Sequence, residues 1–382
     1  MSDPHRIYEI RCPVHGFISF NDWEREIINQ PAFQRLRRIR QLAWTDYVYP
    51  GAMHTRFEHS LGVMHIAGQL FDKVKLRSLE ILKTELAYDD QGFARDRQIV
   101  RLAALLHDTG HAPFSHAGED VFPTNPKNAK RYKHEEYSSA VIRYELKDVI
   151  ESHAFNQNLE IKANDVASLV DGTSGVGRRA LWRELIDSHM DADRMDYLLR
   201  DSPHTGVDYG KYDWRRILNT IQVIELPQEE GSAGRQGLRL GVSKGGIHAA
   251  EALVLARYSM FTQVYFHKTR VAYDHHIRHA LKAMLPNGAF PLPTPDGINE
   301  YILRDDWRVL GLLANGKGEY HGDRLLKRDH YREVYETPEC PNEEHRARLV
   351  EVHTKLGDLC CNGILKDFGL QHRRQTRYFR SY

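Results

Sequence analysis

Four segments of the chain bring together histidine and carboxylate side chains, the types that bind transition metals and move protons. They are residues 54–63 (HTRFEHSLGV), 105–116 (LLHDTGHAPFSH), 132–138 (YKHEEYS) and 189–201 (HMDADRMDYLLRD). Histidine is also abundant, with 22 copies among 382 residues. Imidazole is the commonest protein ligand for metals and the side chain that titrates near neutral pH. These segments are therefore candidates for a metal site or for acid–base chemistry.

The adjacent pair His107 and Asp108 lies at the end of an apolar segment and is followed by Thr109 and Gly110, where a helix would stop. Polar side chains at the end of a buried helix cost free energy. A bound metal offsets that cost, because neutral imidazole and carboxylate both become ligands. An adjacent pair cannot complete a site by itself, so further ligands must come from other helices.

His59 and Asp193 are the natural suppliers of those further ligands. Two histidines and two carboxylates leave open positions on a six-coordinate metal for water and phosphate oxygens, as hydrolysis of a phosphoester or anhydride requires. Because imidazole is a softer donor than oxygen, the set suits Mn, Fe, Zn or Ni better than Ca.

Hydrophobic periodicity predicts that helices position these side chains. Apolar residues recur at steps of three and four, which is the spacing of one helical face. The predicted helices cover residues 59–79, 96–106, 178–200 and 247–284, the last with an interruption near 261–268.

Two other features break the helical pattern. Strand-like runs at 220–226 and 238–242 flank a polar, glycine-containing run and predict a β-hairpin. The proline-rich segment 286–296 marks a soft domain boundary. We therefore expect one domain over residues 1–285 and a mostly helical C-terminal region of unknown role over 286–382.

The composition excludes several classes of protein. Lys and Arg number 53 against 52 Asp and Glu, so the net charge of +1 gives no global bias toward DNA or a membrane. Four cysteines are too few for a disulfide framework and fit a reducing cytoplasm. The start of the chain carries frequent charges without an apolar run, and no window approaches a membrane span. We expect a cytoplasmic protein without a signal peptide or a membrane partner.

The ordered set of one histidine, the His-Asp pair and a later aspartate resembles the HD-domain phosphohydrolase superfamily. More narrowly, the chain is similar to the deoxynucleoside triphosphate triphosphohydrolase branch, which includes bacterial dGTPases and the vertebrate sterile-alpha-motif HD-domain enzyme. The similarity also covers FQRLRRIRQL (33–42), VYPGAMHTRFEH (48–59) and VYFHKTR (264–270), and extends over roughly residues 14–281. It implies an all-α fold, a multi-helix HD domain with a small β-hairpin insertion.

The resemblance also implies roles for individual residues. The metal ligands would be His59, His107, Asp108 and Asp193, and the catalytic residues His111, His116, Glu119 and His134. His116 and Glu119 are three apart, so the carboxylate could orient the imidazole. For His111 and His134, contact with the phosphates and a hydrogen-bonding role behind the ligands both stay open.

A further group would bind the substrate: Gln41, Leu42, Arg56, Tyr197, Asp201, Tyr265 and Lys268. In the family pattern a bulky Leu42 near C2′ would exclude a 2′-hydroxyl, and Arg56 and Lys268 would supply positive charge to phosphates. Asp193, Tyr197 and Asp201 are spaced four apart and would share one helical stripe. Asp196 and Arg200 lie off that stripe and are expected to form an ion pair.

The implied reaction is hydrolysis of a deoxynucleoside triphosphate to a deoxynucleoside and inorganic triphosphate. Water attacks the α-phosphorus in line while His116 or a neighbour moves protons. A divalent metal at the HD site, with Mg on the substrate phosphates, and a homo-oligomer are implied as well. Gln34 and Arg37 match allosteric residues of the family. The stretch 29–31 departs from its guanine-reading pattern, so a nucleotide effector is implied without the identity of its base.

Two alternatives stay open. One is an HD-type phosphodiesterase or nuclease acting on cyclic nucleotides or single-stranded nucleic acid. It rests on the basic, aromatic tail at 371–382, which otherwise reads as a solvated terminus. Nucleic acid is accordingly a partner that is considered but not favoured. The other alternative is a non-catalytic nucleotide sensor, which the full set of ligands disfavours.

Overall fold

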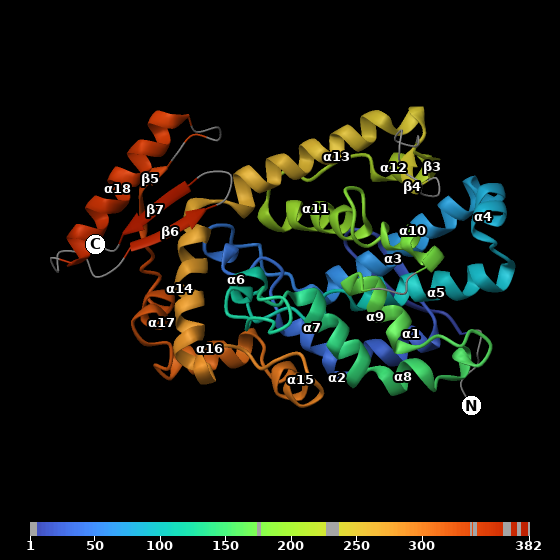
Figure 1. Ribbon diagram of the computed structural model, residues 1–382, viewed down its shortest axis with the longest axis horizontal. Coiled ribbons are helices and arrows are strands. Elements are labelled where there is room, and N and C mark those ends of the chain that lie inside the picture. The colour runs from blue at the N-terminus through green and yellow to red at the C-terminus, as the bar shows by residue number, and fades with distance from the viewer. Residues whose placement is uncertain are drawn as a thin grey trace.

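The protein is built mainly from α-helices (Figure 1), and the computed structural model describes residues 6–173, 177–226, 237–336, 338, 342–361, 368–372 and 376–380. The first helices are α1 (Asp22–Ile28), α2 (Pro31–Gln34), α3 (Arg56–Arg77), α4 (Leu79–Leu86), α5 (Asp90–Leu106), α6 (His116–Glu119), α7 (His134–Ala140), α8 (Lys147–Glu151) and α9 (Ala163–Asp171). The remaining helices are α10 (Ala180–Arg183), α11 (Ala192–Thr205), α12 (Trp214–Thr220), α13 (Ile247–Met260), α14 (Lys268–Met284), α15 (Pro295–Ile302), α16 (Asp306–Ala314), α17 (Glu319–Leu326) and α18 (Glu343–Cys361). The all-α class with a small β insertion is confirmed.

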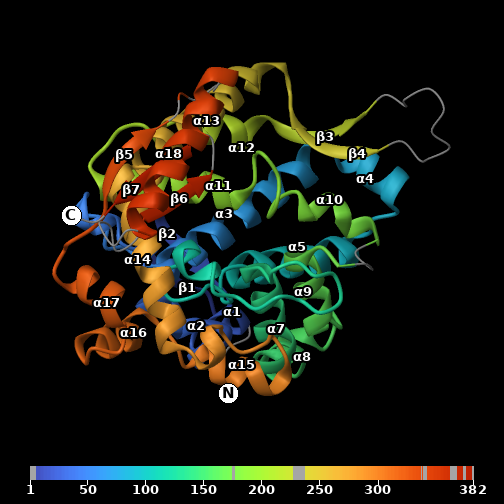
Figure 2. The same ribbon diagram turned by 60° about the vertical axis from the view of Figure 1, so that its left-hand side comes forward.

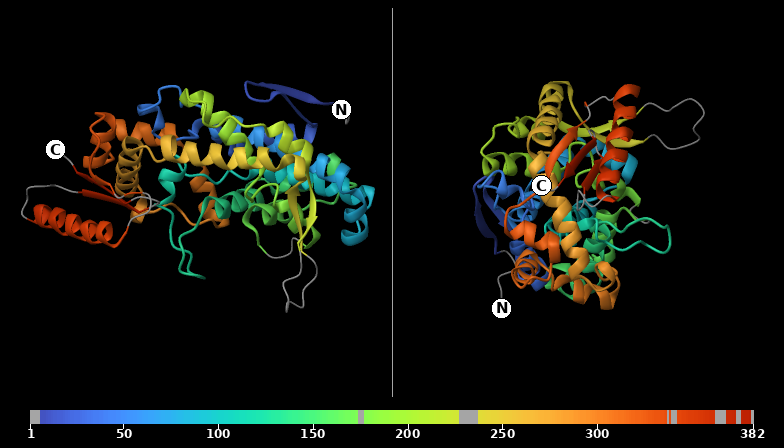
Figure 3. Two further views of the ribbon diagram at one scale, coloured as in Figure 1. Left: turned by 90° about the horizontal axis from the view of Figure 1, so that it is seen from above. Right: turned by 90° about the vertical axis from the view of Figure 1, so that its left-hand side faces the viewer.

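The strands form three small antiparallel sheets at the periphery. Their bounds are β1 (Tyr8–Cys12), β2 (Gly16–Phe20), β3 (Ile221–Glu225), β4 (Leu238–Val242), β5 (Arg332–Glu336), β6 (Phe368–His372) and β7 (Thr376–Arg380). The predicted hairpin is β3–β4, with Ile221 opposite Val242, and Figure 2 shows it projecting from the helices. The sheet of order β5-β7-β6 lies beside α18 at one end of the molecule, with α4 at the other (Figure 3).

Helix ends, rather than helix middles, carry the side chains of interest. A capping box between Thr55 and Glu58 starts α3, and the Asp89 carboxylate accepts a hydrogen bond of 2.7 Å from Gly92 N to start α5. The last residue of α5 is Leu106. His59 therefore lies in the first turn of α3, and His107 directly follows α5, where apolar packing ends.

One predicted helix is wrong in its extent. The stretch 178–200 is not continuous, because α10 ends at Arg183 and α11 begins only at Ala192. The intervening turn is closed by a hydrogen bond of 2.9 Å from Ala192 N to Leu185 O, and the Asp191 carboxylate caps the new helix. The break places Asp193 in a first turn, beside His59.

The interruption of 247–284 is confirmed, since a π-helical segment Phe261–Tyr265 separates α13 from α14.

The C-terminal region contributes to the same hydrophobic core as the residues before 285. Ile298, Tyr301, Val309 and Leu313 of α15 and α16 belong to that cluster. The division at residue 285 stays a prediction. The β5-β7-β6 sheet was not predicted, and the side chains of the basic tail lie outside the described residues.

No helix in the described parts of the chain combines the length and apolarity that crossing a membrane requires.

The buried Arg35 generates a prediction about stability. It is fully buried and donates to the carbonyl oxygens of Arg304 (2.7 Å), Thr109 (3.2 Å) and His111 (2.8 Å). Arg35→Ala leaves these carbonyls without a donor, so the free energy of unfolding should fall by about 3 kcal/mol in chemical denaturation. Exposed Arg37→Ala should change it by less than about 0.5 kcal/mol. Equal effects of the two substitutions would contradict this account.

Candidate metal centre and active site

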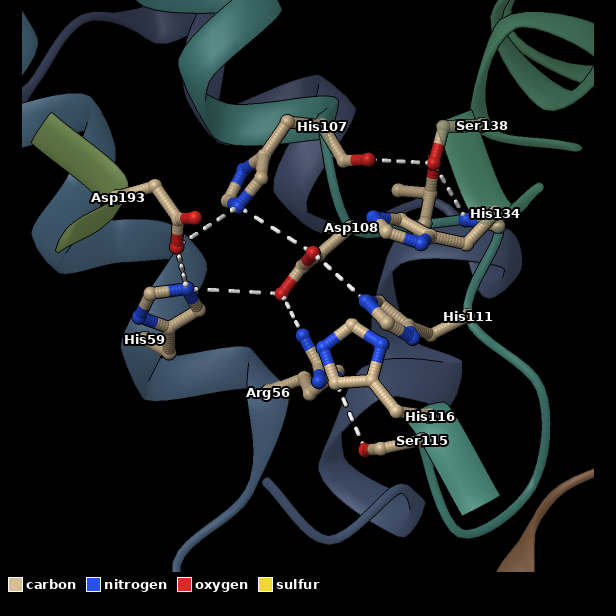
Figure 4. Close-up of polar contacts among 12 residues, drawn as sticks. Arg56, His59, His107, Asp108, His111, Ser115, His116, His134, Ser138 and Asp193 are labelled. Carbon is tan, nitrogen blue, oxygen red and sulfur yellow. Dashed lines mark hydrogen bonds and ion pairs between the residues drawn. The ribbon is translucent and has the colours of Figure 1, made fainter. Parts of the chain in front are cut away.

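The side chains predicted as metal ligands meet at one point (Figure 4), where His59, His107 and Asp108 are buried and the Asp193 side chain is 33% exposed. His59 Nε2 lies 3.0 Å from Asp193 Oδ1 and 3.6 Å from Asp108 Oδ2. His107 Nε2 lies 3.3 Å from Asp108 Oδ1 and 3.7 Å from Asp193 Oδ1. Three different elements supply them: the first turn of α3, the end of α5 and the first turn of α11. The chain thus brings together two imidazoles and two carboxylates that lie far apart in sequence.

The outer nitrogens of both imidazoles are already engaged. His59 Nδ1 donates to Asp196 Oδ2 at 2.8 Å, and His107 Nδ1 donates to the carbonyl oxygen of Ala104 at 2.7 Å. These donations leave each Nε2 lone pair facing the centre, where no described residue makes a well-formed hydrogen bond to it. Such orphaned buried nitrogens beside carboxylates fit a divalent transition metal.

The ionisation of the carboxylates suits the same interpretation. Burial acts to raise the pKa of Asp108, but the positive charges of Arg56 and His107 hold it well below its usual range. Burial acts to lower the pKa of His59. The contacts of His59 with Asp193 and Asp196 outweigh burial and raise this pKa to about 10. A metal ion would therefore compete with a proton at this imidazole.

Asp196 accepts a hydrogen bond from His59 Nδ1 and thereby orients the imidazole ring. Its carboxylate accepts from Arg200 Nε at 2.7 Å and Nη2 at 2.8 Å, so the expected ion pair is confirmed. It also accepts from His15 Nε2 at 2.5 Å, in the turn between β1 and β2. Sequence reasoning missed both the link to His59 and the part of His15, because nothing local connects residues 15, 59 and 196.

A second cluster of titratable side chains adjoins the first. Glu119 Oε1 lies 2.7 Å from His116 Nδ1, 3.0 Å from His134 Nδ1 and 3.3 Å from His111 Nδ1. The His111 and His134 rings stack at 3.9 Å, and His111 Nε2 is 3.1 Å from Asp108 Oδ1. The cluster therefore touches the candidate metal ligands directly.

Charge is divided unevenly within this second cluster. Burial acts to lower the pKa of His134. The nearby carboxylate of Glu119 outweighs burial and raises this pKa to about 9. Burial, together with the charges of Arg56 and His134, holds the pKa of His111 well below its usual range. At neutral pH the cluster thus contains a cationic His134 stacked on a neutral His111, a combination suited to moving protons.

Two adjoining cavities of about 190 and 250 Å³ open beside these clusters. Both are lined by Gln41, Arg56, His116, Asp193, Arg194 and Tyr197. The larger one also contacts Leu42, Asp201 and Tyr265, and the Tyr265 hydroxyl donates to Asp201 Oδ2 at 2.6 Å. The predicted substrate residues thus gather around one space, with Lys268 as the exception.

Lys268 is 59% exposed, lies 3.9 Å from Glu333 and is absent from both linings. Gln34 and Arg37 also lie away from the cavities. Arg37 Nε donates a hydrogen bond of 2.8 Å to Gln34 Oε1. The roles of these three residues stay predictions.

Three arginines that sequence reasoning missed line the larger cavity: Arg194, Arg257 and Arg270. The sequence held a signal for two of them. Arg194 directly follows Asp193, and Arg257 precedes Tyr265 by eight positions, about two helical turns. Their charge makes the cavity suited to a polyanion.

A third group of possible ligands, Asp22, Glu26 and His153, is of a different kind. His153 Nδ1 accepts a hydrogen bond from Phe155 N at 3.1 Å, so the proton resides on Nε2, which lies 3.6 Å from Glu26. This imidazole faces its carboxylate as a donor and has no lone pair to offer a metal.

Comparison with known proteins matches the HD domain family over residues 56–201 and the HD associated region over 234–355. An uncharacterized protein of Methanocaldococcus jannaschii is 37% identical over 71% of this chain and 49% of its own length. A deoxynucleoside triphosphate triphosphohydrolase SAMHD1 homolog of Dictyostelium discoideum is 31% identical over 67% and 45%. The chain thus spans about half the length of these curated relatives.

A solved structure resembles nearly the whole chain. It is the crystal structure of a hypothetical protein from Aquifex aeolicus, with a TM-score of 0.76, 25% sequence identity, and coverage of 98% of this chain and 97% of that one. The arrangement of the HD domain with its associated region is therefore shared beyond this protein.

Asp196 generates a prediction about metal retention. Asp196→Asn keeps the shape but weakens the acceptor behind His59, so metal affinity should fall by about 10-fold or more. Metal content after dialysis against a graded chelator series, measured by mass spectrometry, tests this. Asp96→Asn is the matched control. Asp96 is also buried, but its carboxylate accepts a hydrogen bond from Tyr88, which lies in the connection between α4 and α5. Unchanged retention in Asp196→Asn would rule out the orienting role.

His134 generates a prediction about pH. Because its folded-state pKa of about 9 exceeds the ordinary 6.5, its stabilising contribution is complete below pH 6.5 and is lost as pH rises through about 9. Glu119→Gln should lower this pKa and flatten stability between pH 6.5 and 9. Imidazole NMR titration and denaturation at both pH values test it. A wild-type-like titration in Glu119→Gln would assign the shift to another cause.

Proposed function

Because the chain belongs to the HD-domain phosphohydrolase superfamily, we propose that it is a metal-dependent deoxynucleoside triphosphate triphosphohydrolase. Its products are a deoxynucleoside and inorganic triphosphate. One observation carries the proposal: three of the four candidate ligands, His107, Asp108 and Asp193, line a cavity together with Arg56 and Arg194. Ligands for a divalent ion and cations for a polyphosphate thus face the same space.

The larger cavity divides into regions that suit different parts of such a substrate. Arg194, Arg257 and Arg270 offer positive charge to phosphate oxygens. Leu42 and the hydrogen-bonded pair of Tyr265 and Asp201 offer an apolar surface and a carboxylate, which suit C2′ and the 3′-hydroxyl of a deoxyribose. Leu42 would leave no room for a 2′-hydroxyl, and this supports a deoxynucleotide over a ribonucleotide.

The chemistry assigns distinct tasks to the chain's own residues. A divalent ion, when bound, supplies Lewis-acid polarisation of a phosphoryl oxygen. His116 is 56% exposed, and its Nδ1 is held by Glu119, so its Nε2 is directed to the cavity as the group that exchanges a proton with the reacting oxygens. Arg56 donates to Asp108 and to Ser115 Oγ, fixing both against the cavity wall. Cationic His134 lines the smaller cavity and attracts the phosphates there.

A homo-oligomer and a nucleotide effector complete the proposal. Their support is the similarity of Gln34 and Arg37 to family residues at an effector site. Both side chains lie outside the two cavities, so an effector there would not compete with the substrate. Lys268 stays proposed as a residue that supplies positive charge to the phosphates, although it lies apart from the cavity linings.

The test is an assay of every dNTP and NTP, singly and in pairs, with product identification and a labelled oligonucleotide in parallel. We expect inorganic triphosphate from at least one dNTP or dNTP pair, and a loss of at least about 10³-fold in Asp108→Asn. His153→Asn, in the separate Asp22–Glu26–His153 group, should retain activity. Strand cleavage without triphosphate release would instead identify a nuclease, and binding without any product would identify a sensor.

A further inference from the structure

Asp306, the first residue of α16, reaches from the HD associated region into the candidate active site. Its carboxylate accepts two backbone hydrogen bonds, Oδ1 from Phe114 N at 2.7 Å and Oδ2 from Arg40 N at 2.8 Å. The side chain is buried, at 1% exposure. The two acceptor oxygens of one carboxylate therefore join two chain segments that lie about 70 residues apart in sequence.

The two segments form adjoining parts of the cavity wall. Arg40 directly precedes Gln41 and Leu42, and Phe114 precedes Ser115 and His116, all four of which line the larger cavity. A second bond ties the same segments, since Ser115 Oγ donates to the carbonyl oxygen of Arg40 at 2.5 Å. A shift of either segment would therefore move side chains that line the cavity.

The segment Phe114–His116 has a strained backbone, which contacts from other parts of the chain must stabilise. Phe114 and Ser115 have φ values of +60° and +55°, in the left-handed region that non-glycine residues rarely adopt. Such conformations cost on the order of 1–3 kcal/mol each and persist only where surrounding contacts fix them. The bond from Phe114 N to Asp306 is one such contact, and the stacking of Phe114 on Trp44 at 4.9 Å is another.

The strained segment also reaches the metal ligands. Ser115 Oγ accepts from Arg56 Nε at 2.8 Å, and Arg56 Nη1 pairs with the Asp108 carboxylate. A continuous path of hydrogen bonds thus runs from α16 through Ser115 and Arg56 to Asp108. The position of Ser115 decides where Arg56 lies between the cavity and the candidate metal centre.

We propose that Asp306 is a positioning residue, by which the HD associated region holds the Arg40–Leu42 and Phe114–His116 walls in the relative position that the substrate needs. The statement about substrate rests on the proposed function. The statement about the two walls does not.

A structural role in α16 alone does not account for this carboxylate. The neighbouring Asp305 already caps the helix, since its Oδ1 accepts from Arg308 N at 2.9 Å. Burial raises the pKa of Asp306 to about 7, even though the bonds from Arg40 and Phe114 and the charges of Arg40 and Arg35 oppose it. An apolar side chain would fill the site without that cost, so the two acceptor oxygens are the property that the position uses.

The test compares Asp306→Ala, which removes both acceptors, with Asp306→Asn, which keeps one oxygen and presents an amide donor to the other N–H. Backbone hydrogen exchange by mass spectrometry should show faster exchange in peptides covering 38–42 and 112–116 for Asp306→Ala. In Asp306→Asn at least one of the two should exchange faster. Tyr88→Phe is the control, because it loses a buried 2.6 Å bond to Asp96 away from the site and should leave both peptides unchanged.

Kinetics provide the second readout. With the dNTP that the wild-type protein hydrolyses, kcat/KM should fall by 10- to 100-fold in Asp306→Ala while Tyr88→Phe stays within about 3-fold. If Asp306→Ala does not fold, Asp306→Asn carries both measurements. Unchanged exchange at both peptides, or an activity loss no greater than that of Tyr88→Phe, overturns the proposal. A wild-type protein inactive on every nucleotide would refute the proposed function, while the exchange experiment would still decide whether Asp306 holds the walls.

Discussion

The burial of two imidazole nitrogens against two carboxylates is the constraint on which the rest of the structure depends. Polar groups that meet largely away from water are tolerated only if each has a partner. The fold meets this need by ending helices there, so that His59, His107 and Asp193 come from the start of α3, the end of α5 and the start of α11. Asp196 and Ala104 then accept from the outer nitrogens of the two imidazoles and leave both Nε2 atoms for a cation.

Electrostatics extend outward from this centre in layers. Asp108 contacts His59 and His107 on one side and Arg56 and His111 on the other. Beyond it, Glu119 contacts three imidazoles, and arginines line the adjoining cavity. The negative charge of the ligands is thus bordered by the positive charge that would hold a polyanion, with Arg56 in contact with both Asp108 and the cavity. Attraction for a metal and attraction for phosphates can therefore coexist within a short distance.

Sequence reasoning predicted what short-range patterns encode. The helices, the β3–β4 hairpin and the ion pair of Asp196 with Arg200 follow from periodicity and spacing, and the ligand set came from the resemblance of the motifs. The break before Asp193 was missed because residues 184–191 carry no proline or glycine to mark it, and a turn bonded through Asp191 makes it instead. His15 and Asp306 were missed because their partners are backbone or side-chain groups far along the chain.

The distribution of the site over two matched regions bears on what the HD domain can do alone. Residues 56–201 contain every candidate metal ligand, yet Arg257 and Tyr265 of the larger cavity lie in the associated region. So do Tyr301, whose hydroxyl donates to Gly110 O at 2.7 Å, and Asp306. The first domain therefore specifies where an ion would bind, whereas the shape of the space beside it is set by helices from both. The residues that line this space are accordingly drawn from both regions.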